Sequence, residues 1–232
     1  MSALKIDIQP ELSDLFPDLT IGCILAGVEV TPSDGELKEE MQELCDKLVP
    51  DLTPESIRRH PVVEMTKNAY RKMGKDPNRY RPAAESLLRR LASGKGLYHV
   101  NNMVDILNMV SVATGFSIGG YDGDKIQGSV TFGLGRNQEP YRGIGRGELN
   151  IENLPVFRDE TGAFGTSTSD SVRTMVTGDT RKFLMVFPAF EKMDEPLNGA
   201  LEYAEKLLVE LGGVKEMTVG WQGKGAAKKE LQ

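Results

Sequence analysis

Apolar positions repeat along the chain at spacings that predict an alternation of helices and strands. Leu37, Met41 and Leu44 recur at helical spacing and predict a helix over residues 33–49, with Ser33 as its cap. Further helices are expected over residues 61–73, 82–92, 102–115 and 195–211. Runs rich in β-branched residues predict strands over residues 20–30, 182–190 and 214–221. The chain is therefore expected to contain both helices and strands.

After residue 122 the pattern changes to short β-runs separated by glycine. Residues 128–136, 139–147 and 153–160 predict a meander whose turns contain the glycines. The glycines at 143, 145 and 147 fit no phosphate-binding fingerprint and are interpreted as turn residues. Residues 162–180 are dense in Gly, Ser and Thr and predict an ordered loop whose amides and hydroxyls point inward.

Residues 94–122 are expected to form the centre of the fold. Their pattern predicts a loop, a buried helix and a tight return. Asn102 is the expected helix cap, and Gly115 closes the far end. The helix is apolar all round, which is typical of a core helix, except for a stripe at Asp105, Asn108 and Ser111. A buried polar group without a partner costs about 1 to 3 kcal/mol, so each member of the stripe needs a protein partner or a ligand.

Composition narrows the class of protein without naming its function. The 232 residues are 39% hydrophobic and 27% charged, as expected for a soluble globular protein. The length is compatible with one large domain or two small ones, and because no linker long enough to divide two domains is evident, a single domain over residues 1–232 is expected. No apolar run approaches the roughly 20 residues that span a bilayer, and the first residues lack a signal-peptide hydrophobic region, so a cytoplasmic protein with no membrane partner is expected. Two cysteines and two histidines form no recognisable ligand cluster, so neither a metal nor a cofactor is expected.

Charge is distributed unevenly along the chain. Residues 1–57, an acidic strand and helix region, carry a net charge of −10, and residues 58–95, a basic helical region, carry +8. The site-bearing core over residues 96–190 and the C-terminal helix and strand over residues 194–221 belong to a remainder of −4. The basic side chains are either solvated helix faces or contacts for a nucleic-acid backbone. Candidates for backbone contacts are Arg79, Arg81, Arg89, Arg90 and Lys95.

Motifs in the second half of the chain carry a family resemblance. Val104, Asp105 and Asn108 form a VDxxN pattern, followed by the pair Tyr121–Asp122 and the run DKI at residues 124–126. Two later motifs are SDSVRT at residues 169–174 and TGDT at residues 177–180. In order and spacing these motifs resemble the B3/B4 editing domain of the bacterial phenylalanyl-tRNA synthetase β subunit, and the later pair resembles free-standing B3/B4 proteins.

The resemblance implies a three-layer α+β domain with a central β-sandwich or mixed sheet flanked by helices. It also implies hydrolysis of the ester that joins a wrong amino acid to tRNA, with the aminoacylated 3′ end of tRNA as partner and no DNA. Leu107 replaces the family threonine, Gly119 replaces the family histidine, and no glutamate lies near residues 184–187. These departures argue against specificity for tyrosyl-tRNA, but they are compatible with hydrolysis of an aminoacyl-tRNA ester.

Roles carry over residue by residue. Asn108 would hold the ester or a water, groups around Ser169, Asp170 and Thr174 would stabilise the oxyanion, and Arg173 would hold a phosphate or lock its loop by pairing with a carboxylate. Asp170 or Asp122 would bind the amine or a cationic side chain of the substrate. Each of these residues also has a structural interpretation: Asp122 can cap a turn, and Asp170 can form an internal salt bridge with Arg173. Tyr121 can be a residue of the core. The implied substrate-binding residues are Asp105, Gly119, Tyr121, Asp122, Arg173 and Thr180.

Two other functions stay open. A non-catalytic module that binds tRNA or an amino acid would tolerate the loss of the threonine and the histidine. A serine hydrolase has only His60 and His99 as bases and no GxSxG elbow. An acidic, hydroxyl-rich site suits a polar or cationic amino acid, and free-standing relatives that clear arginine-analogue esters from tRNA suggest such a substrate. The sequence identifies neither the tRNA nor the oligomeric state.

Overall fold

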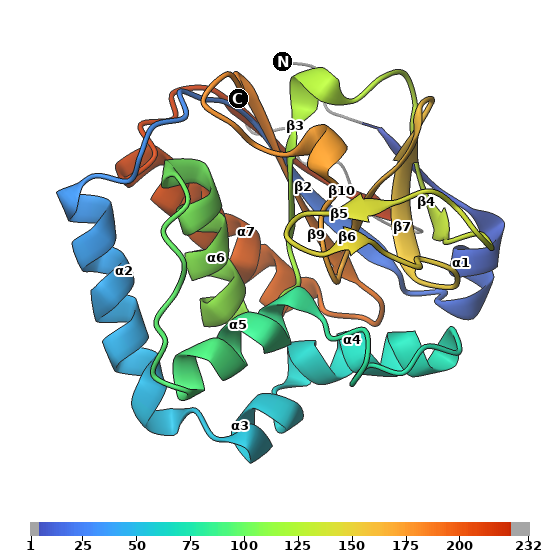
Figure 1. Cartoon of the computed structure of the whole chain (residues 1–232), viewed down its shortest axis with the longest axis horizontal. Helices are drawn as coiled ribbons and strands as arrows, with labels where there is room; N and C mark the ends of the chain where they lie inside the picture. The colour runs from blue at the N-terminus through green and yellow to red at the C-terminus, as the bar shows by residue number, and fades with distance from the viewer. Residues whose placement is uncertain (1–4, 224–232) are drawn as a thin grey trace.

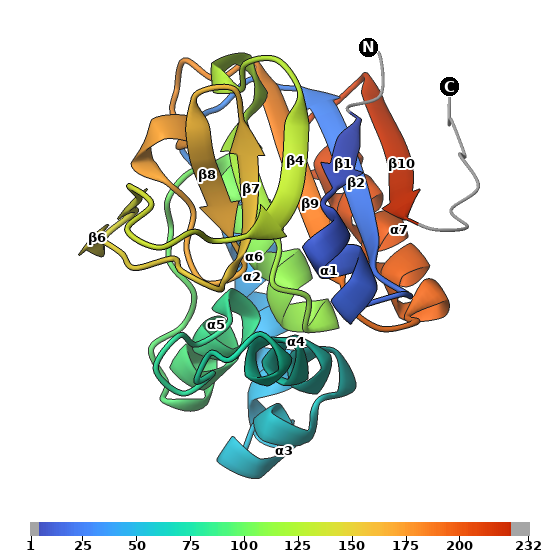
Figure 2. The same cartoon turned by 90° about the vertical axis from the view of Figure 1, so that its right-hand side faces the viewer.

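Two four-stranded sheets face each other in the computed structural model, which describes residues 5–223, and helices cover the outer side of one of them (Figures 1 and 2). The first sheet has the order β1 (Ile6–Ile8), β4 (Val130–Leu134), β7 (Pro155–Asp159) and β8 (Gly162–Thr166). The second has the order β10 (Met217–Gly223), β2 (Thr20–Gly27), β9 (Lys182–Ala189) and β3 (Gly119–Asp122). The α+β class with a sandwich and flanking helices is confirmed.

Seven α-helices lie within the described residues. They are α1 (Pro10–Leu15), α2 (Gly35–Leu48), α3 (Pro54–Arg59), α4 (Pro61–Lys72), α5 (Ala83–Ala92), α6 (Asn102–Thr114) and α7 (Asp194–Glu210). Short 3₁₀ turns are η1 (Val49–Asp51), η2 (Gly123–Lys125) and η3 (Val172–Thr174), and a small hairpin is formed by β5 (Arg142–Gly143) and β6 (Gly147–Glu148). None of the described helices is both long and apolar enough to cross a bilayer.

Aromatic side chains fill the space between the sheets. The rings of Phe132 and Phe157 stack with centroids 4.2 Å apart, and Tyr121 meets Phe164 edge to face at 4.9 Å. The first pair lies within one sheet, between β4 and β7, and the second joins β3 to β8 of the facing sheet; all four side chains are buried. Offset and edge-to-face pairs each add about 0.5 to 1.5 kcal/mol beyond their buried area. The core therefore fixes β3, which follows α6, against the first sheet.

Helix α6 lies against the second sheet, and small residues let the two approach closely. A Cβ atom at Gly120 of β3 would fall 2.4 Å from Leu107 Cδ1, and one at Gly22 of β2 would fall 3.0 Å from Leu197 Cδ1 of α7. Both distances are too short for a side chain at these glycines without movement of the leucines. Helices α6 and α7 thus pack on the sheet through leucines that face glycine.

Two predicted caps are wrong by one residue. Asn101, not Asn102, caps α6 by accepting the Val104 N–H, and Asp34, not Ser33, caps α2 by accepting the Leu37 N–H. The displaced side chains bond elsewhere, because tertiary partners compete for them. Asn102 bonds to the backbone at Thr31 and Glu29, and the Ser33 hydroxyl donates to Asp105 at 2.6 Å.

The segment predicted as a loop over residues 162–180 begins with a strand. Residues 162–166 form β8, which pairs with β7 through a register shift at residues 157–158. Glycine and threonine hid this strand because they weaken the apolar alternation that identifies one. Helices α1 and α3 and strand β1, each six residues or shorter, were not predicted at all.

Candidate functional site

The polar stripe of α6 divides into members that the protein satisfies and one that it does not. Asp105 is fully buried and accepts hydrogen bonds from the Ser33 hydroxyl at 2.6 Å and the Val100 N–H at 2.9 Å. The Ser111 hydroxyl donates to the Phe116 carbonyl at 2.7 Å. Asn108, only 9% exposed, makes no side-chain hydrogen bond within residues 5–223. Its amide is therefore the member of the stripe that is free for a ligand.

The position of Asn108 follows from the helix repeat. Leu107 faces Gly120 of β3, and Asp105 faces the connection that precedes α6. A residue advances by about 100° around a helix, so Asn108 lies on the side between these two contacts. The free amide thus points toward the region bounded by β3 and the connection over residues 93–101.

Residues 166–171, called here the Ser/Thr loop, bring together elements that are distant in sequence. The Ser167 carbonyl accepts the Ala83 N–H at the start of α5 at 2.9 Å, and the Asp170 carbonyl accepts the Ile144 N–H of the β5–β6 hairpin at 2.9 Å. Within the loop, the Thr166 hydroxyl donates to the Ser169 carbonyl at 3.0 Å. The loop is held by backbone groups on both sides, so its own side chains have fixed positions.

Three tyrosine side chains approach the Ser/Thr loop. The Tyr141 hydroxyl donates to the Ser169 carbonyl at 2.6 Å, and the Tyr70 hydroxyl lies 2.9 Å from Thr168 Oγ1. The Tyr121 and Ser167 hydroxyls are buried beside the Asp170 carboxyl and the Tyr70 hydroxyl, respectively, but neither makes a hydrogen bond of good geometry within the described residues. Burial, followed by the nearby Asp170 carboxyl, raises the pKa of Tyr121. Such a concentration of unpaired buried hydroxyls is unusual in a protein interior.

Asp170 belongs to the same cluster. Its Oδ2 accepts the Gly120 N–H at 3.2 Å, which ties the Ser/Thr loop to β3. Burial raises the pKa of Asp170 to about 7, although the Gly120 N–H and the Tyr121 hydroxyl act in the opposite direction. A carboxyl group with a pKa near neutrality can exchange a proton under physiological conditions.

Gly119 and Gly165 make room for the Tyr121 hydroxyl. A Cβ atom at Gly119 would lie 2.1 Å from that oxygen, and a Cβ atom at Gly165 would lie 2.0 Å from it. A histidine at position 119 is therefore incompatible with this placement of Tyr121. Any side chain at position 119 would force the Tyr121 ring to move.

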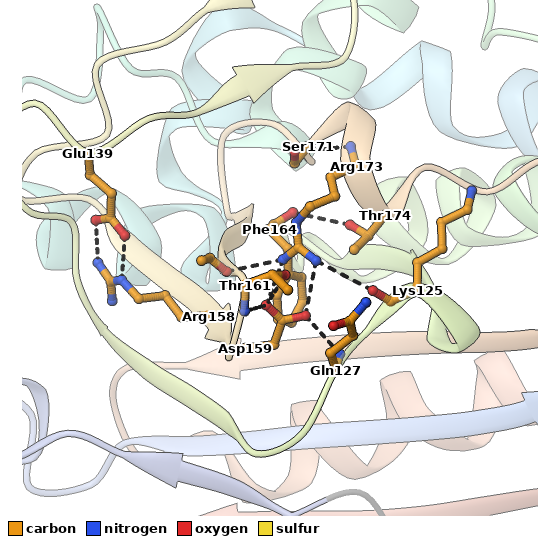
Figure 3. Close-up of polar contacts among 11 residues, drawn as sticks. Lys125, Gln127, Glu139, Arg158, Asp159, Thr161, Phe164, Ser171, Arg173 and Thr174 are labelled. Carbon is orange, nitrogen blue, oxygen red and sulfur yellow. Dashed lines mark hydrogen bonds and ion pairs between the residues drawn. The ribbon is translucent and has the colours of Figure 1, made fainter.

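Several predicted site residues are committed to contacts within the protein. The Arg173 guanidinium donates to both carboxylate oxygens of Asp159 at 2.9 and 3.0 Å, and not to Asp170 (Figure 3). Asp122 caps η2 and accepts the Thr180 hydroxyl at 2.8 Å. Thr174 is fully buried, and its hydroxyl reaches the Phe164 carbonyl at 3.4 Å. The contacts of Arg173 and Asp122 are those of a loop lock and a turn cap.

A second pair lies close to Arg173 in Figure 3. Arg158 donates to both carboxylate oxygens of Glu139, each at 2.6 Å, and to the Leu134 carbonyl at 2.7 Å. Burial opposes ionisation of Asp159, but the Arg173 guanidinium and the N–H groups of Gln127 and Thr161 hold its pKa below the usual value. The charges of this network are paired, which leaves little capacity for a ligand.

The five predicted tRNA-backbone residues have unequal surroundings. Arg89 donates to buried Glu85 at 2.8 Å, and the guanidinium of Arg90 lies 3.8 Å from the ring centroid of Tyr98. Arg81 is half-buried, and its Nε has no partner among the described residues. Arg79 and Lys95 are exposed. The basic region thus includes side chains that stabilise the helices as well as free ones.

The histidines give a serine hydrolase no support. Within the described part of the chain, neither His60 nor His99 makes a hydrogen bond to a serine. The ring of His60 packs against Gly115, and burial lowers its pKa. His99 Nδ1 lies 3.8 Å from Asp105 Oδ2 with its side chain 56% exposed.

Two surface hollows lie away from this cluster. One, of about 280 Å³, is lined by residues of β1, α1 and β10, and another, of about 180 Å³, lies between α1 and α4. No predicted site residue lines either hollow.

Sequence reasoning missed Tyr70, Tyr141 and Ser167. Tyr70 is on α4 and Tyr141 precedes β5, so nothing in their spacing indicates that both reach the same loop. Ser167 lies in the segment that was expected to point hydroxyls inward, but no pattern distinguished it from its neighbours.

Comparisons with known proteins bear on this arrangement. Residues 65–211, more than half of the chain, match the family described as the B3/4 domain. A solved N-terminal fragment of the phenylalanyl-tRNA synthetase β subunit from Pyrococcus horikoshii is 14% identical with a TM-score of 0.46. That alignment covers 94% of this chain and 53% of the fragment, so the chain spans about half of the fragment's length. No curated protein matched the sequence. From the family match, the chain belongs to the B3/4 domain family.

Proposed function

We propose that this protein is a trans-editing deacylase that hydrolyses the ester of a mischarged tRNA. Membership of the B3/4 domain family supports a tRNA-related role. The observation that carries the proposal is the unpaired amide of Asn108 on a buried helix. The Asn108 side chain has no protein hydrogen-bond partner among the described residues and keeps 9% of its surface exposed, so a ligand can reach and satisfy its amide.

The chemistry needs a positioned water, a proton acceptor and donors for the oxyanion. Water adds to the ester carbonyl carbon, the bond from that carbon to the ribose oxygen breaks, and a proton passes to the ribose oxygen. Asn108 would hold the carbonyl or the water, and the Ser167 hydroxyl is a free donor for the oxyanion. Asp170, with a pKa of about 7, would accept a proton from the water in its ionised form.

The same groups suggest the class of amino acid that is removed. Asp170 supplies a carboxyl group, and Tyr121 and Ser167 supply unpaired hydroxyls. These groups match a polar or cationic side chain, such as that of an arginine analogue, better than an apolar one, because an apolar side chain would leave them unsatisfied. We further propose that residues 1–232 form a single domain that works in the cytoplasm, consistent with the continuous core that joins both sheets and the helices.

Hydrolysis of a panel of correctly and incorrectly charged tRNAs tests the proposal. The purified protein should release one class of amino acid selectively in the presence of EDTA, and Asn108→Ala should lower the rate by about 10²- to 10³-fold, as expected for the loss of one donor to the oxyanion. Asn68→Ala, an exposed change on α4, is the matched control and should keep the rate. Release from no tRNA, with tRNA still bound, would favour the non-catalytic binding module instead.

A further inference from the structure

Residues 93–101, called here the α5–α6 connection, form a well-anchored loop. Gly94 and Gly96 adopt positive φ angles of 72° and 60°, which favour glycine. Leu97 is buried, and the Val100 N–H is fixed by Asp105 of α6 at 2.9 Å. Since the loop is anchored at both positions, the side chains around them are held in place before any ligand arrives.

This anchored loop presents unusually exposed apolar side chains. Val100 is 58% exposed and Tyr98 is 52% exposed, the highest values among the large hydrophobic residues in the described part of the chain. The intervening His99 side chain is 56% exposed. Burial of an aromatic ring is favourable, so a ring held outward on a fixed loop indicates a surface that contacts a partner.

Arg90 covers one face of the exposed ring. Its guanidinium carbon lies 3.8 Å from the ring centroid of Tyr98, and its Nη2 donates to the Lys95 carbonyl at 3.2 Å. The backbone of the connection thus holds the guanidinium, and the guanidinium supports the ring through a cation–π contact. With one face covered by Arg90 and half of the residue in solvent, the ring can accept a second planar group on its free side.

We propose that Tyr98, supported by Arg90, is a stacking platform for an unpaired nucleobase in the single-stranded 3′ end of a tRNA. The identity of the RNA rests on the proposed function. An aromatic face accepts any base, and Arg90 and Lys95 supply positive charge for the adjoining phosphates. The platform also borders the candidate site, because Asp105, which holds Val100, precedes Asn108 by one turn of α6.

The charges on the two sides of the α5–α6 connection indicate how the RNA strand would be oriented on the platform. Helix α5 contributes Arg89 and Arg90, whereas α2 carries Glu39, Glu43 and Asp46. The connection contacts α2 through the backbone of Leu97, which lies against the Cys45 thiol, and contacts α6 through the Val100 N–H, which donates to Asp105. Phosphates are therefore expected on the α5 side of the platform, away from the acidic helix.

Binding of two labelled RNA hairpins tests this assignment by fluorescence anisotropy. One hairpin ends in four unpaired 3′ nucleotides and the other is blunt. The unchanged protein should bind the overhang more tightly, and Tyr98→Ala should weaken overhang binding by about 5- to 100-fold and blunt binding by less than about twofold, because stacking on the ring is lost. Tyr98→Phe should keep the preference. Val209→Ala, which alters a residue of α7 that is 50% exposed, is the matched control and should leave both affinities unchanged.

Tyr98→Leu separates stacking from simple apolar contact, since leucine keeps bulk but has no π face. Tyr98→Leu should lose the overhang preference, as Tyr98→Ala does. If Tyr98→Ala does not fold, the affinities of Tyr98→Leu for the two hairpins test the platform instead. Retention of the preference in Tyr98→Leu, equal losses for both hairpins, or no binding of either hairpin by the unchanged protein would overturn the platform. Overhang preference without deacylation would instead refute the proposed function alone, and deacylation with unchanged affinity in Tyr98→Leu would refute the platform alone.

Discussion

Two neighbouring regions of the molecule treat their polar groups in opposite ways. In the network of Arg158, Glu139, Arg173 and Asp159, each guanidinium meets a carboxylate with two short hydrogen bonds. At the Ser/Thr loop, the Ser167 and Tyr121 hydroxyls make no well-formed hydrogen bond within residues 5–223, and Asp170 is bonded by the Gly120 N–H with no cation among those residues. The first region uses charge to hold loops together, and the second leaves hydrogen-bonding capacity unused.

The pKa values of two aspartates express the same difference. Both carboxyl groups are partly desolvated, but the donors around Asp159 hold its pKa below the usual value, whereas burial dominates at Asp170 and raises its pKa to about 7. A carboxylate that is fully paired is fixed in one ionisation state at neutral pH. A carboxyl group near its pKa at neutrality can take part in proton transfer, which is why the second region is the better candidate for chemistry.

The largest expected effect comes from breaking the paired region. Arg158→Ala should lower the free energy of unfolding by about 3 to 5 kcal/mol, because it leaves the Glu139 carboxylate partly buried and without its cation. Denaturant unfolding would measure the loss. Arg59→Ala removes the arginine of an exposed pair with Glu55 and should cost less than about 1 kcal/mol. Equal losses in the two variants would show that the buried pair is not special.

An intermediate effect should separate two members of the α6 stripe. Asp105→Ala removes a buried acceptor with two partners and should cost about 1.5 to 3 kcal/mol of stability for each charge-assisted hydrogen bond that is lost. Asn108→Ala removes an amide with no protein partner and should change stability by less than about 1 kcal/mol. Thermal and denaturant unfolding of both variants would check the difference. A loss in Asn108→Ala as large as that in Asp105→Ala would mean that the amide supports the fold.

A further effect is a dependence of stability on pH at Asp170. Since its pKa in the folded protein is raised from 3.8 to about 7, the folded state binds the proton more tightly than the unfolded state. This contribution is present in full below about pH 4 and is lost as the pH rises through about 7. Asp170→Asn should therefore gain stability relative to the unchanged protein between these two pH values. A constant difference across the range would contradict the raised pKa.

The regular elements of the fold were largely predictable from the sequence. Strands β2 and β9 and helices α2, α4, α5, α6 and α7 match the expected segments to within a few residues, because long apolar patterns carry a strong periodic signal. The caps at Asn102 and Ser33 were wrong, since adjacent polar residues compete for the same role and tertiary contacts choose between them. Strand β8 was hidden by its small residues.

For the candidate site, the sequence supplied part of the residue list but not the relations within it. The stripe on α6 and the density of hydroxyls before residue 172 were visible. Which stripe member would remain unpaired was not visible, because the partner of Asp105 is Ser33, 72 residues away. Nor could the sequence show that Arg173 pairs with Asp159 and not with Asp170.

By itself, the sequence determined the α+β class, the core helix, the glycine at its end and the motifs of the B3/4 domain family. These features depend on local propensity and on patterns along the chain. Only the tertiary structure decided which polar groups are satisfied. The approach of Tyr70, Tyr121 and Tyr141 to one loop, the room that Gly119 leaves for a hydroxyl, and the support of Tyr98 by Arg90 all depend on segments meeting in space. Hydrogen bonding and desolvation act over a few ångströms between such segments, so these relations exist only in the folded chain.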